Sequence, residues 1–283
     1  MLLPPKLSLP LQVARSLLAR PRMLSYGAHP SQTADLHLPS GPGPFPVAVV
    51  IHGGYWQAQW SKLVTRPVSL DLAGRGWAAW NIEYRRLGPD GGGWPATFDD
   101  VARAIDHLAE LNHPNLDLGT VVAVGHSAGG QLALWAGARK RFAAGEPGAG
   151  PLVEVRRVIA LAAVTHLRHA GRTASVLLGG TPQEMPDRWA LADPMAQVPL
   201  DVPVLLVHPQ DDSTVSEQQS SAYAEAARAA GGEVALVRPE SGGHRAPIDP
   251  STQAWKSVAS WLRETWPEAS SGAGPAAAPP SAE

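Results

Sequence analysis

The sequence predicts an α/β protein with a doubly wound, mostly parallel sheet, helices on both faces and a small helical cap. Apolar, β-branched runs alternate with segments of helical periodicity, which is typical of parallel sheets. The run at 47–52 is apolar almost throughout, as in a strand buried on both faces. The 283 residues, 44% hydrophobic and 17% charged, suffice for one large α/β domain or two small ones.

The elements are expected in strict alternation along the chain. The predicted strands cover residues 33–38, 47–52, 77–84, 121–124, 158–161, 202–208 and 233–237. The first alternates polar and apolar residues, which favours an edge strand. The predicted helices cover residues 65–75, a segment that opens at 97, the stretch after 127, 216–230 and 251–266. We expect Thr97 to cap its helix, with Asp100 completing a capping box.

The predicted domain covers residues 25–267, with an extension before it, a cap segment within it and a tail after it. Residues 1–24 form an N-terminal extension, in which 11–20 is expected to be a short amphipathic helix that packs on the domain or stays loose. Residues 165–200 lack strand character and are interpreted as a cap over the carboxyl edge of the sheet. Residues 268–283 are almost entirely Ala, Pro, Ser and Gly, which predicts disorder.

Composition narrows the function classes. The net charge is −2 without a basic run, so neither a nucleic acid nor an anionic membrane is an expected partner. The absence of cysteine excludes disulfides, thiolate metal sites and a cysteine nucleophile. No apolar run reaches 18 residues and no secretory signal is evident, so a cytoplasmic location is the default expectation. The oligomeric state stays open.

A serine at a sharp turn is the candidate nucleophile. The apolar run 121–124 leads into Gly125-His-Ser127-Ala-Gly129, and helical spacing follows. Strand, turn and helix are the context of a G-x-S-x-G nucleophile elbow, with Ser127 at its tip. The chain has 28 glycines, so the motif alone could be a plain turn. Its interpretation therefore depends on finding an acid and a base in compatible order.

Two later strand ends supply them. Asp211 and Asp212 follow the strand at 202–208, and His244 follows the strand at 233–237. We favour Asp212 over Asp211 because Asp212-x-x-Val215 has the spacing of an acid motif in which the valine anchors the loop. Ser127, Asp212 and His244 then appear in the order nucleophile, acid, base of an α/β-hydrolase. Histidine suits the role of base because its ordinary pKa of about 6.5 lets it take and return a proton.

An oxyanion needs backbone N–H donors close to the serine. Ala128 offers one at the start of the helix that follows the nucleophile. Gly54 and Tyr55 offer others, since they follow the buried strand at 47–52, and Gly53 permits the turn. None of this chemistry requires a cofactor. His29, His37 and His52 lack a recognisable metal-ligand spacing, so no metal is expected.

These motifs resemble those of the α/β-hydrolase superfamily over about residues 25–266. His52-Gly-Gly-Tyr-Trp56 is similar to the H-G-G-x-W box of kynurenine formamidases (arylformamidases). Gly125–Gly130 resembles the elbow that they share with hormone-sensitive-lipase-like esterases, and Asp212-x-x-Val215 matches the superfamily's acid motif. Tyr55 replaces the last glycine of H-G-G-G esterases, which favours the formamidase side. His208-Pro209 replaces a common His-Gly, which weakens the choice between the two aspartates.

The resemblance implies a metal-independent serine hydrolase of small amides or carboxylic esters, arylformamidase-like, that acts through an acyl-enzyme on Ser127. Tyr55, Trp56, Trp94 and His126 are the candidate substrate-binding residues, and an aromatic wall would suit an aryl substrate. The cap segment, including His166, is a further candidate contact. A general carboxylesterase or a prolyl-oligopeptidase-like peptidase is the alternative, although the chain has no room for a gating domain. A non-catalytic ligand-binding hydrolase fold is the third interpretation.

Overall fold

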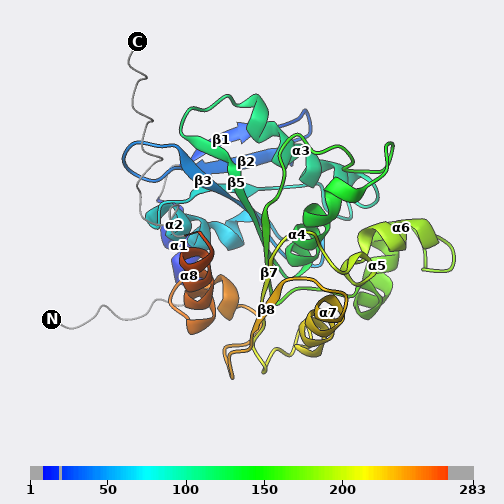
Figure 1. Cartoon of the computed structure of the whole chain (residues 1–283). Helices are drawn as coiled ribbons and strands as arrows, with labels where there is room; N and C mark the ends of the chain where they lie inside the picture. Colours follow the sequence, from blue (N-terminus) through cyan, green and yellow to red (C-terminus); the bar gives the residue numbers. More distant parts are fainter. Residues whose placement is uncertain (1–8, 19–20, 267–283) are drawn as a thin grey trace, which may run out of the picture.

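The computed structural model describes residues 9–18 and 21–266. At its centre is an eight-stranded sheet with the strand order β1-β2-β4-β3-β5-β6-β7-β8 (Figure 1). From β4 to β8 neighbouring strands are parallel, whereas β2 pairs antiparallel with both β1 and β4. The strands are β1 (Arg22–Ser25), β2 (Thr33–His37), β3 (Phe45–Ile51), β4 (Ala78–Ile82), β5 (Leu116–His126), β6 (Arg157–Leu161), β7 (Val204–Val207) and β8 (Val234–Val237).

Helices cover both faces of this sheet, as the alternating pattern predicted. They are α1 (Leu9–Ser16), α2 (Arg66–Gly74), α3 (Ala96–Glu110), α4 (Ala128–Ala138), α5 (Gly171–Leu178), α6 (Pro186–Ala192), α7 (Gln218–Ala229) and α8 (Gln253–Thr265). Along β3, Val49 belongs to the core under α3, α4 and α7, whereas Val50 belongs to the core under α2 and α8. This period of two buries both faces of the strand, which is why its sequence is apolar throughout.

The sheet extends one strand further than predicted. The strand expected at the edge, β2, lies between β1 and β4. β1 is the edge strand on this side of the sheet. Three of its four residues are exposed, so its sequence lacks the hydrophobic pattern that predicts a strand. The sheet therefore begins inside the segment that was expected to be an N-terminal extension.

The capping box predicted for α3 is wrong. Pro95 occupies the N-cap position, and no side chain caps the helix. The Thr97 hydroxyl instead donates to the Arg85 carbonyl at 2.6 Å. Asp100 pairs with the Arg85 guanidinium at 2.7 Å. Both side chains therefore fasten the loop after β4 to α3, a tertiary role that competes with local capping.

The two segments outside the α/β alternation are both helical. Residues 165–200 contain η3 (Leu167–Ala170), α5, α6 and η4 (Pro194–Gln197), and pack through backbone carbonyls that accept from Trp94 and Gln131. α1 lies against α2, and Gln12 donates to Asp249 at 2.6 Å. The predicted disordered tail at 268–283 lies outside the described residues. Among the described helices, none is both long and apolar enough to cross a membrane.

Candidate active site

Ser127 sits at the junction of β5 and α4 in a strained backbone conformation. Its φ of 54° and ψ of −119° are unusual for a residue with a side chain. The turn needs glycine on both sides: a Cβ at Gly129 would collide with the carbonyl groups of Ile51 and His52, and one at Gly125 with the Gly129 backbone. The elbow is therefore pressed against the end of β3, as the predicted nucleophile turn requires.

Asp212 and His244 meet across the carboxyl edge of the sheet. Asp212 follows β7 and His244 follows β8, and Asp212 Oδ2 lies 2.7 Å from His244 Nδ1. The carboxylate is fully buried, whereas the imidazole is 15% exposed. Nδ1–H of His244 therefore donates to Asp212, which leaves Nε2 free for an acid–base role. Of the two adjacent aspartates, Asp212 is the one that contacts the imidazole.

The environment of Asp212 keeps its side chain ionised. Burial alone would raise the pKa of this carboxyl group, but four hydrogen bonds together hold the pKa well below its ordinary value. His208 and His244 donate to Oδ2, while the backbone N–H groups of Thr214 and Val215 donate to Oδ1 at 2.8 and 3.0 Å. The carboxylate thus stays negative beside His244 through the neutral pH range.

His208 is a functional candidate that the sequence analysis missed. It is fully buried, and its Nε2 atom lies 3.1 Å from Asp212 Oδ2 and 2.9 Å from the Val215 carbonyl oxygen. Both partners only accept, so Nε2 carries a proton, and Nδ1 is hydrogen-bonded to the Ser220 hydroxyl at 2.7 Å. His208 thereby fixes the acid. Its place at the end of β7 was the available signal, but it was treated only as a departure from the family pattern.

Asp211 has a different task. Its two carboxylate oxygens accept from the backbone N–H groups of Gly242 and Gly243 at 3.0 and 2.8 Å. These bonds lower the pKa of Asp211 below its ordinary value. Asp211 therefore holds the loop that carries His244, while Asp212 holds the imidazole itself.

Ser127 and His244 open into one cavity of about 400 Å³. Its lining is mainly apolar and comes from five parts of the chain, namely α1, the segment between β3 and α2, the elbow, the segment after β7 and the segment after β8. The lining residues are Leu9, Pro10, Val13, Gly53, Gly54, Tyr55, Trp60, Val64, His126, Ser127, Thr214, His244, Arg245 and Ile248.

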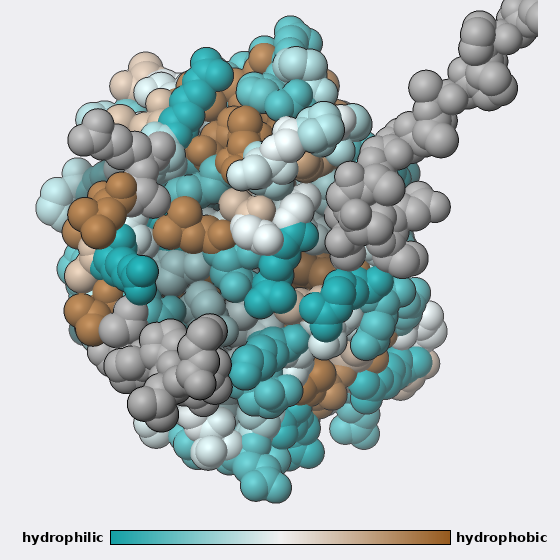
Figure 2. All heavy atoms as spheres, turned by 90° about the vertical axis from the view of Figure 1, so that its left-hand side faces the viewer, coloured by the Kyte–Doolittle hydropathy of each residue, from teal (hydrophilic) through white to brown (hydrophobic). Residues whose placement is uncertain are grey.

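The wall of the cavity differs from the predicted one. In the described part of the chain, the segment 165–200 contributes no lining residue, and α1 supplies Leu9, Pro10 and Val13 instead. His166 is turned to Asp193, 2.8 Å away, and so does not reach the cavity. On the face of the molecule that carries α1, apolar side chains form separate patches among polar ones (Figure 2).

Two of the predicted substrate-binding residues are held away from the cavity, Trp56 in the core and Trp94 packed against the core. Trp56 is fully buried, and its indole N–H donates to Gln131 at 3.1 Å. Trp94 packs against Phe98, with ring centroids 5.0 Å apart. Neither tryptophan lines the cavity. Of the predicted residues Tyr55, Trp56 and Trp94, Tyr55 alone lines the cavity. The chain turns at Tyr55 and Trp56, where φ is positive, and the Trp56 side chain points into the core.

His126 lines the cavity, but its side chain is hydrogen-bonded to the backbone of the loop that carries His244. Its ring lies 4.7 Å from that of His244, and Nε2–H donates to the His244 backbone carbonyl at 2.8 Å. Burial, together with the nearby His244, lowers the pKa of His126 to about 3. A neutral His126 therefore fixes the loop of the base, in addition to forming part of the cavity wall.

The three predicted oxyanion donors belong to the segment after β3 and to the start of α4. We define residues 53–55 as the glycine loop. Gly54 and Tyr55 line the cavity, and Ala128 begins α4, where the helix dipole favours negative charge. A Cβ added at Gly53 would lie 2.9 Å from Ser127 Cβ, so the glycine loop touches the nucleophile. Gly54 has a φ of 118°, a conformation suited to glycine.

The BD-FAE family profile matches residues 34–226, which include the glycine loop, Ser127 and Asp212. The chain belongs to the BD-FAE family. No curated protein matches this family member's sequence. Its fold is that of the α/β-hydrolases, as its similarity to solved structures shows.

Three solved structures illustrate the likeness of this BD-FAE member to known folds. A truncated carbohydrate esterase from gut microbiota aligns with a TM-score of 0.73 and 24% identity over 85% of this chain and 94% of that one. The thermophilic esterase Est2 of Thermogutta terrifontis gives 0.71 and 21% over 87% and 92%. An acetyl ester-xyloside bifunctional hydrolase of Caldicellulosiruptor lactoaceticus gives 0.70 and 22% over 87% and 96%.

Proposed function

We propose that this protein is a serine hydrolase of carboxylic esters that works through an acyl-enzyme on Ser127. The observation that carries the proposal is the contact of Asp212 with His244. His244 and the strained Ser127 line the same cavity. Family membership supports it, as do the esterase descriptions of the three structural neighbours. Side chains of this chain suffice for the reaction.

In the proposed mechanism, Nε2 of His244 takes the hydroxyl proton as Ser127 Oγ attacks the ester carbonyl carbon. The carbonyl electron pair moves onto oxygen, and Asp212 stabilises the imidazolium that forms. When the tetrahedral intermediate collapses, the C–O bond to the alcohol breaks and His244 returns its proton to the leaving oxygen. Water then attacks the acyl-enzyme by the same route, which releases the acid and restores Ser127.

The oxyanion of each tetrahedral intermediate is assigned to the backbone N–H groups of Gly54, Tyr55 and Ala128. Each such donor contributes about 10²–10³ in rate when it is fixed in advance. The close approach of Gly53 to Ser127 supports this assignment.

The lining of the cavity indicates the kind of ester. Leu9, Val13, Val64 and Ile248 give it an apolar character that suits an uncharged acyl or aryl group. The structural neighbours are described as a carbohydrate esterase, a thermophilic esterase and an acetyl ester-xyloside bifunctional hydrolase, so we propose short carboxylic esters of an alcohol or sugar as the substrate class.

Hydrolysis of an aryl formamide is the second candidate. Tyr55, from the His52-Gly-Gly-Tyr-Trp56 box that resembles kynurenine formamidases, does line the cavity. Trp56, the other aromatic residue of that box, is buried in the core instead. None of the three structural neighbours is described as a formamidase. An ester is therefore the primary proposal.

Labelling with a fluorophosphonate, followed by paired substrate kinetics, tests both candidates. We expect the folded protein to be labelled at Ser127 and Ser127→Ala to remain unlabelled. We then expect a higher kcat/KM for p-nitrophenyl acetate or butyrate than for N-formyl-L-kynurenine. The reverse preference would favour the formamidase candidate. Absence of labelling in folded protein would contradict a serine hydrolase and support a non-catalytic binding fold.

A further inference from the structure

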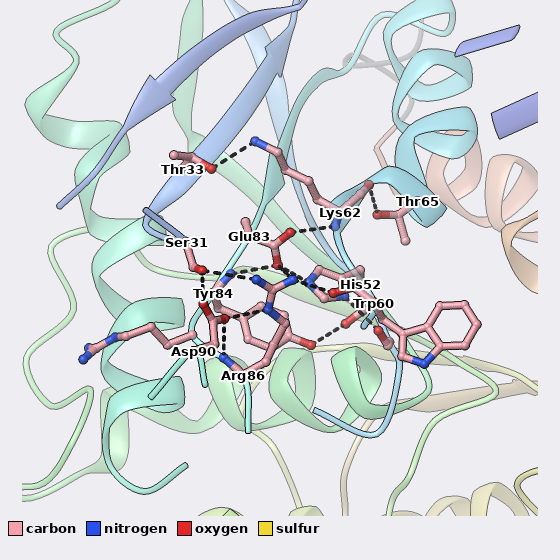
Figure 3. A network of polar contacts seen from close by, with 12 residues as sticks. Ser31, Thr33, His52, Trp60, Lys62, Thr65, Glu83, Tyr84, Arg86 and Asp90 are labelled. Atoms are coloured by element: carbon pink, nitrogen blue, oxygen red, sulfur yellow. Dashed lines mark hydrogen bonds and ion pairs between the residues drawn. The ribbon is translucent and has the colours of Figure 1, made fainter. Parts of the chain in front are cut away.

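A buried cluster of charged side chains lies directly behind the glycine loop. His52, which precedes this loop, is fully buried, and Glu83 at the end of β4 is 6% exposed. Figure 3 shows the Glu83 carboxylate between His52, Lys62 and Arg86. The proposed reaction uses none of these side chains. Their arrangement nevertheless determines how the loop is held.

The hydrogen bonds of His52 show its protonation. Nδ1 lies 2.8 Å from the Gly53 carbonyl oxygen, which can only accept, so Nδ1 carries a proton. Nε2 lies 2.6 Å from Glu83 Oε1. Nε2 donates as well if Glu83 is a carboxylate, and the imidazole is then a cation.

The surroundings of Glu83 indicate a carboxylate. Two backbone N–H groups donate to it, that of Lys62 at 3.1 Å and that of Tyr84 at 3.3 Å, and the Arg86 guanidinium forms an ion pair with it at 3.3 Å. Burial alone would raise the pKa of Glu83, but His52 and Arg86 lower it below its ordinary value. The pair therefore consists of an imidazolium and a carboxylate.

The neighbouring groups neutralise the charges around this pair and fix the orientation of the His52 ring. Arg86 also binds Asp90 at 2.8 Å, and the Lys62 ammonium binds Asp35 at 2.8 Å, so both neighbouring cations have anionic partners. The His52 ring stacks on Tyr84 with centroids 4.4 Å apart and 13° between the planes. A cation over an aromatic face is favourable. The ring thus has one fixed orientation.

Peptide geometry transmits this orientation to the reaction site. The peptide between Gly53 and Gly54 is trans, so its C=O and N–H point in opposite directions. Because His52 holds the Gly53 carbonyl, the Gly54 N–H points away from His52. Gly54 lines the cavity together with Ser127.

We propose that Glu83 and His52 are a positioning pair for the oxyanion hole. Glu83 keeps His52 doubly protonated, and Nδ1–H of His52 holds the Gly53 carbonyl so that the Gly54 N–H faces the developing oxyanion. This inference rests on the proposed ester hydrolysis for its kinetic effect, whereas the protonation of His52 can be measured without any substrate.

Two substitutions of His52 separate positioning from general stability. An asparagine amide can occupy the place of Nδ1 and donate to Gly53, whereas a glutamine amide reaches toward Glu83 and leaves the Gly53 carbonyl unheld. We expect His52→Gln to lower kcat about 10²-fold with little change in KM, and His52→Asn to keep kcat within about tenfold of the wild type. Fluorophosphonate labelling of Ser127 should slow in the same order. Equal losses in both variants, or no loss in His52→Gln, would overturn the positioning role.

Nuclear magnetic resonance of ¹⁵N-histidine-labelled protein tests the pair directly. We expect two hydrogen-bonded ring N–H protons on His52 in the wild type, assigned by their disappearance in His52→Asn. Glu83→Gln should leave one, on Nδ1. A single ring proton in the wild type would overturn the proposal even where the kinetics agree. Conversely, a protein that hydrolyses no ester but shows both protons would lose the proposed function and keep the assignment of the pair.

Discussion

The Nδ1 atom of His244 lies 2.7 Å from Oδ2 of Asp212, across the loops that follow the last two strands of the sheet. Four donors surround that carboxylate, from His208, His244, Thr214 and Val215. Because both oxygens of Asp212 accept hydrogen bonds, its carboxylate has a fixed orientation toward His244. The imidazole is therefore held in the tautomer whose Nδ1–H faces Asp212, which leaves Nε2 free for the proposed proton transfer with Ser127.

Asp212→Asn should lower kcat about 10⁴-fold, because an amide N–H cannot accept from His244 and favours the wrong tautomer. Asp211→Asn is the matched control. Its side chain binds Gly242 and Gly243 only through backbone N–H groups, and an asparagine oxygen can still accept one of these bonds. We expect a loss of less than about tenfold in kcat for this variant. Steady-state kinetics on p-nitrophenyl butyrate measures both, and a larger loss in Asp211→Asn would refute the assignment of the acid.

Val13→Trp should shorten the acyl chains that the enzyme accepts. Val13 of α1 lines the cavity of about 400 Å³, so added bulk there competes with the substrate. We expect kcat/KM for p-nitrophenyl octanoate to fall at least about tenfold, with less than about a twofold change for the acetate. Leu11→Trp, on the exposed side of the same helix at 51% exposure, should change neither. Equal effects of Val13→Trp on both esters would show that α1 is not a wall of the acyl site.

Arg245 should favour substrates that carry a negative charge. It is the one permanently charged side chain among the cavity-lining residues that the structure describes, and its guanidinium lies 5.5 Å from the centre of the Trp60 ring. The side chain is exposed, so an ion pair with substrate is worth up to about 1 kcal/mol, or roughly fivefold.

The test compares p-nitrophenyl hemisuccinate with p-nitrophenyl butyrate at low salt. Arg245→Gln should lower the ratio of their kcat/KM values by up to about fivefold, and added salt should reduce the difference. Arg168→Gln removes an exposed arginine outside the cavity and should leave the ratio unchanged. A ratio unaffected by Arg245→Gln would contradict the prediction.

His126 should make the protein less stable in mild acid. Its pKa is about 3 in the folded state, against an ordinary value of about 6.5 in the unfolded chain. Below pH 6.5 the unfolded state binds the proton first, so the stabilisation is complete above that pH and is lost as the pH falls toward 3. Between pH 7 and pH 5 this one group should lower the free energy of unfolding by about 2 kcal/mol.

Urea unfolding of the wild type and of His126→Gln at the two pH values measures this contribution. Glutamine can still donate to the His244 carbonyl but does not titrate. We expect the pH dependence of the variant to be weaker by the stated amount. Parallel dependence in both proteins would mean that His126 is not a buried neutral imidazole.

The sequence by itself determined the alternation of strands and helices, the elbow at Ser127 and the chain order of Ser127, Asp212 and His244. These features depend on local requirements. A buried strand must be apolar, the turn at Ser127 admits no side chain at Gly125 or Gly129, and the strands of a parallel sheet end at one edge. Each requirement leaves its mark within a few neighbouring residues.

The tertiary structure alone decided the direction of each side chain. It placed Trp56 in the core and Trp94 against it, and it made α1, in place of residues 165–200, a wall of the cavity. It also joined His208 to Asp212 and Glu83 to His52. A buried polar group is unfavourable unless it forms a hydrogen bond. Its partner is whichever polar group the packing brings within bonding distance, and that group can come from a segment that is distant in the chain.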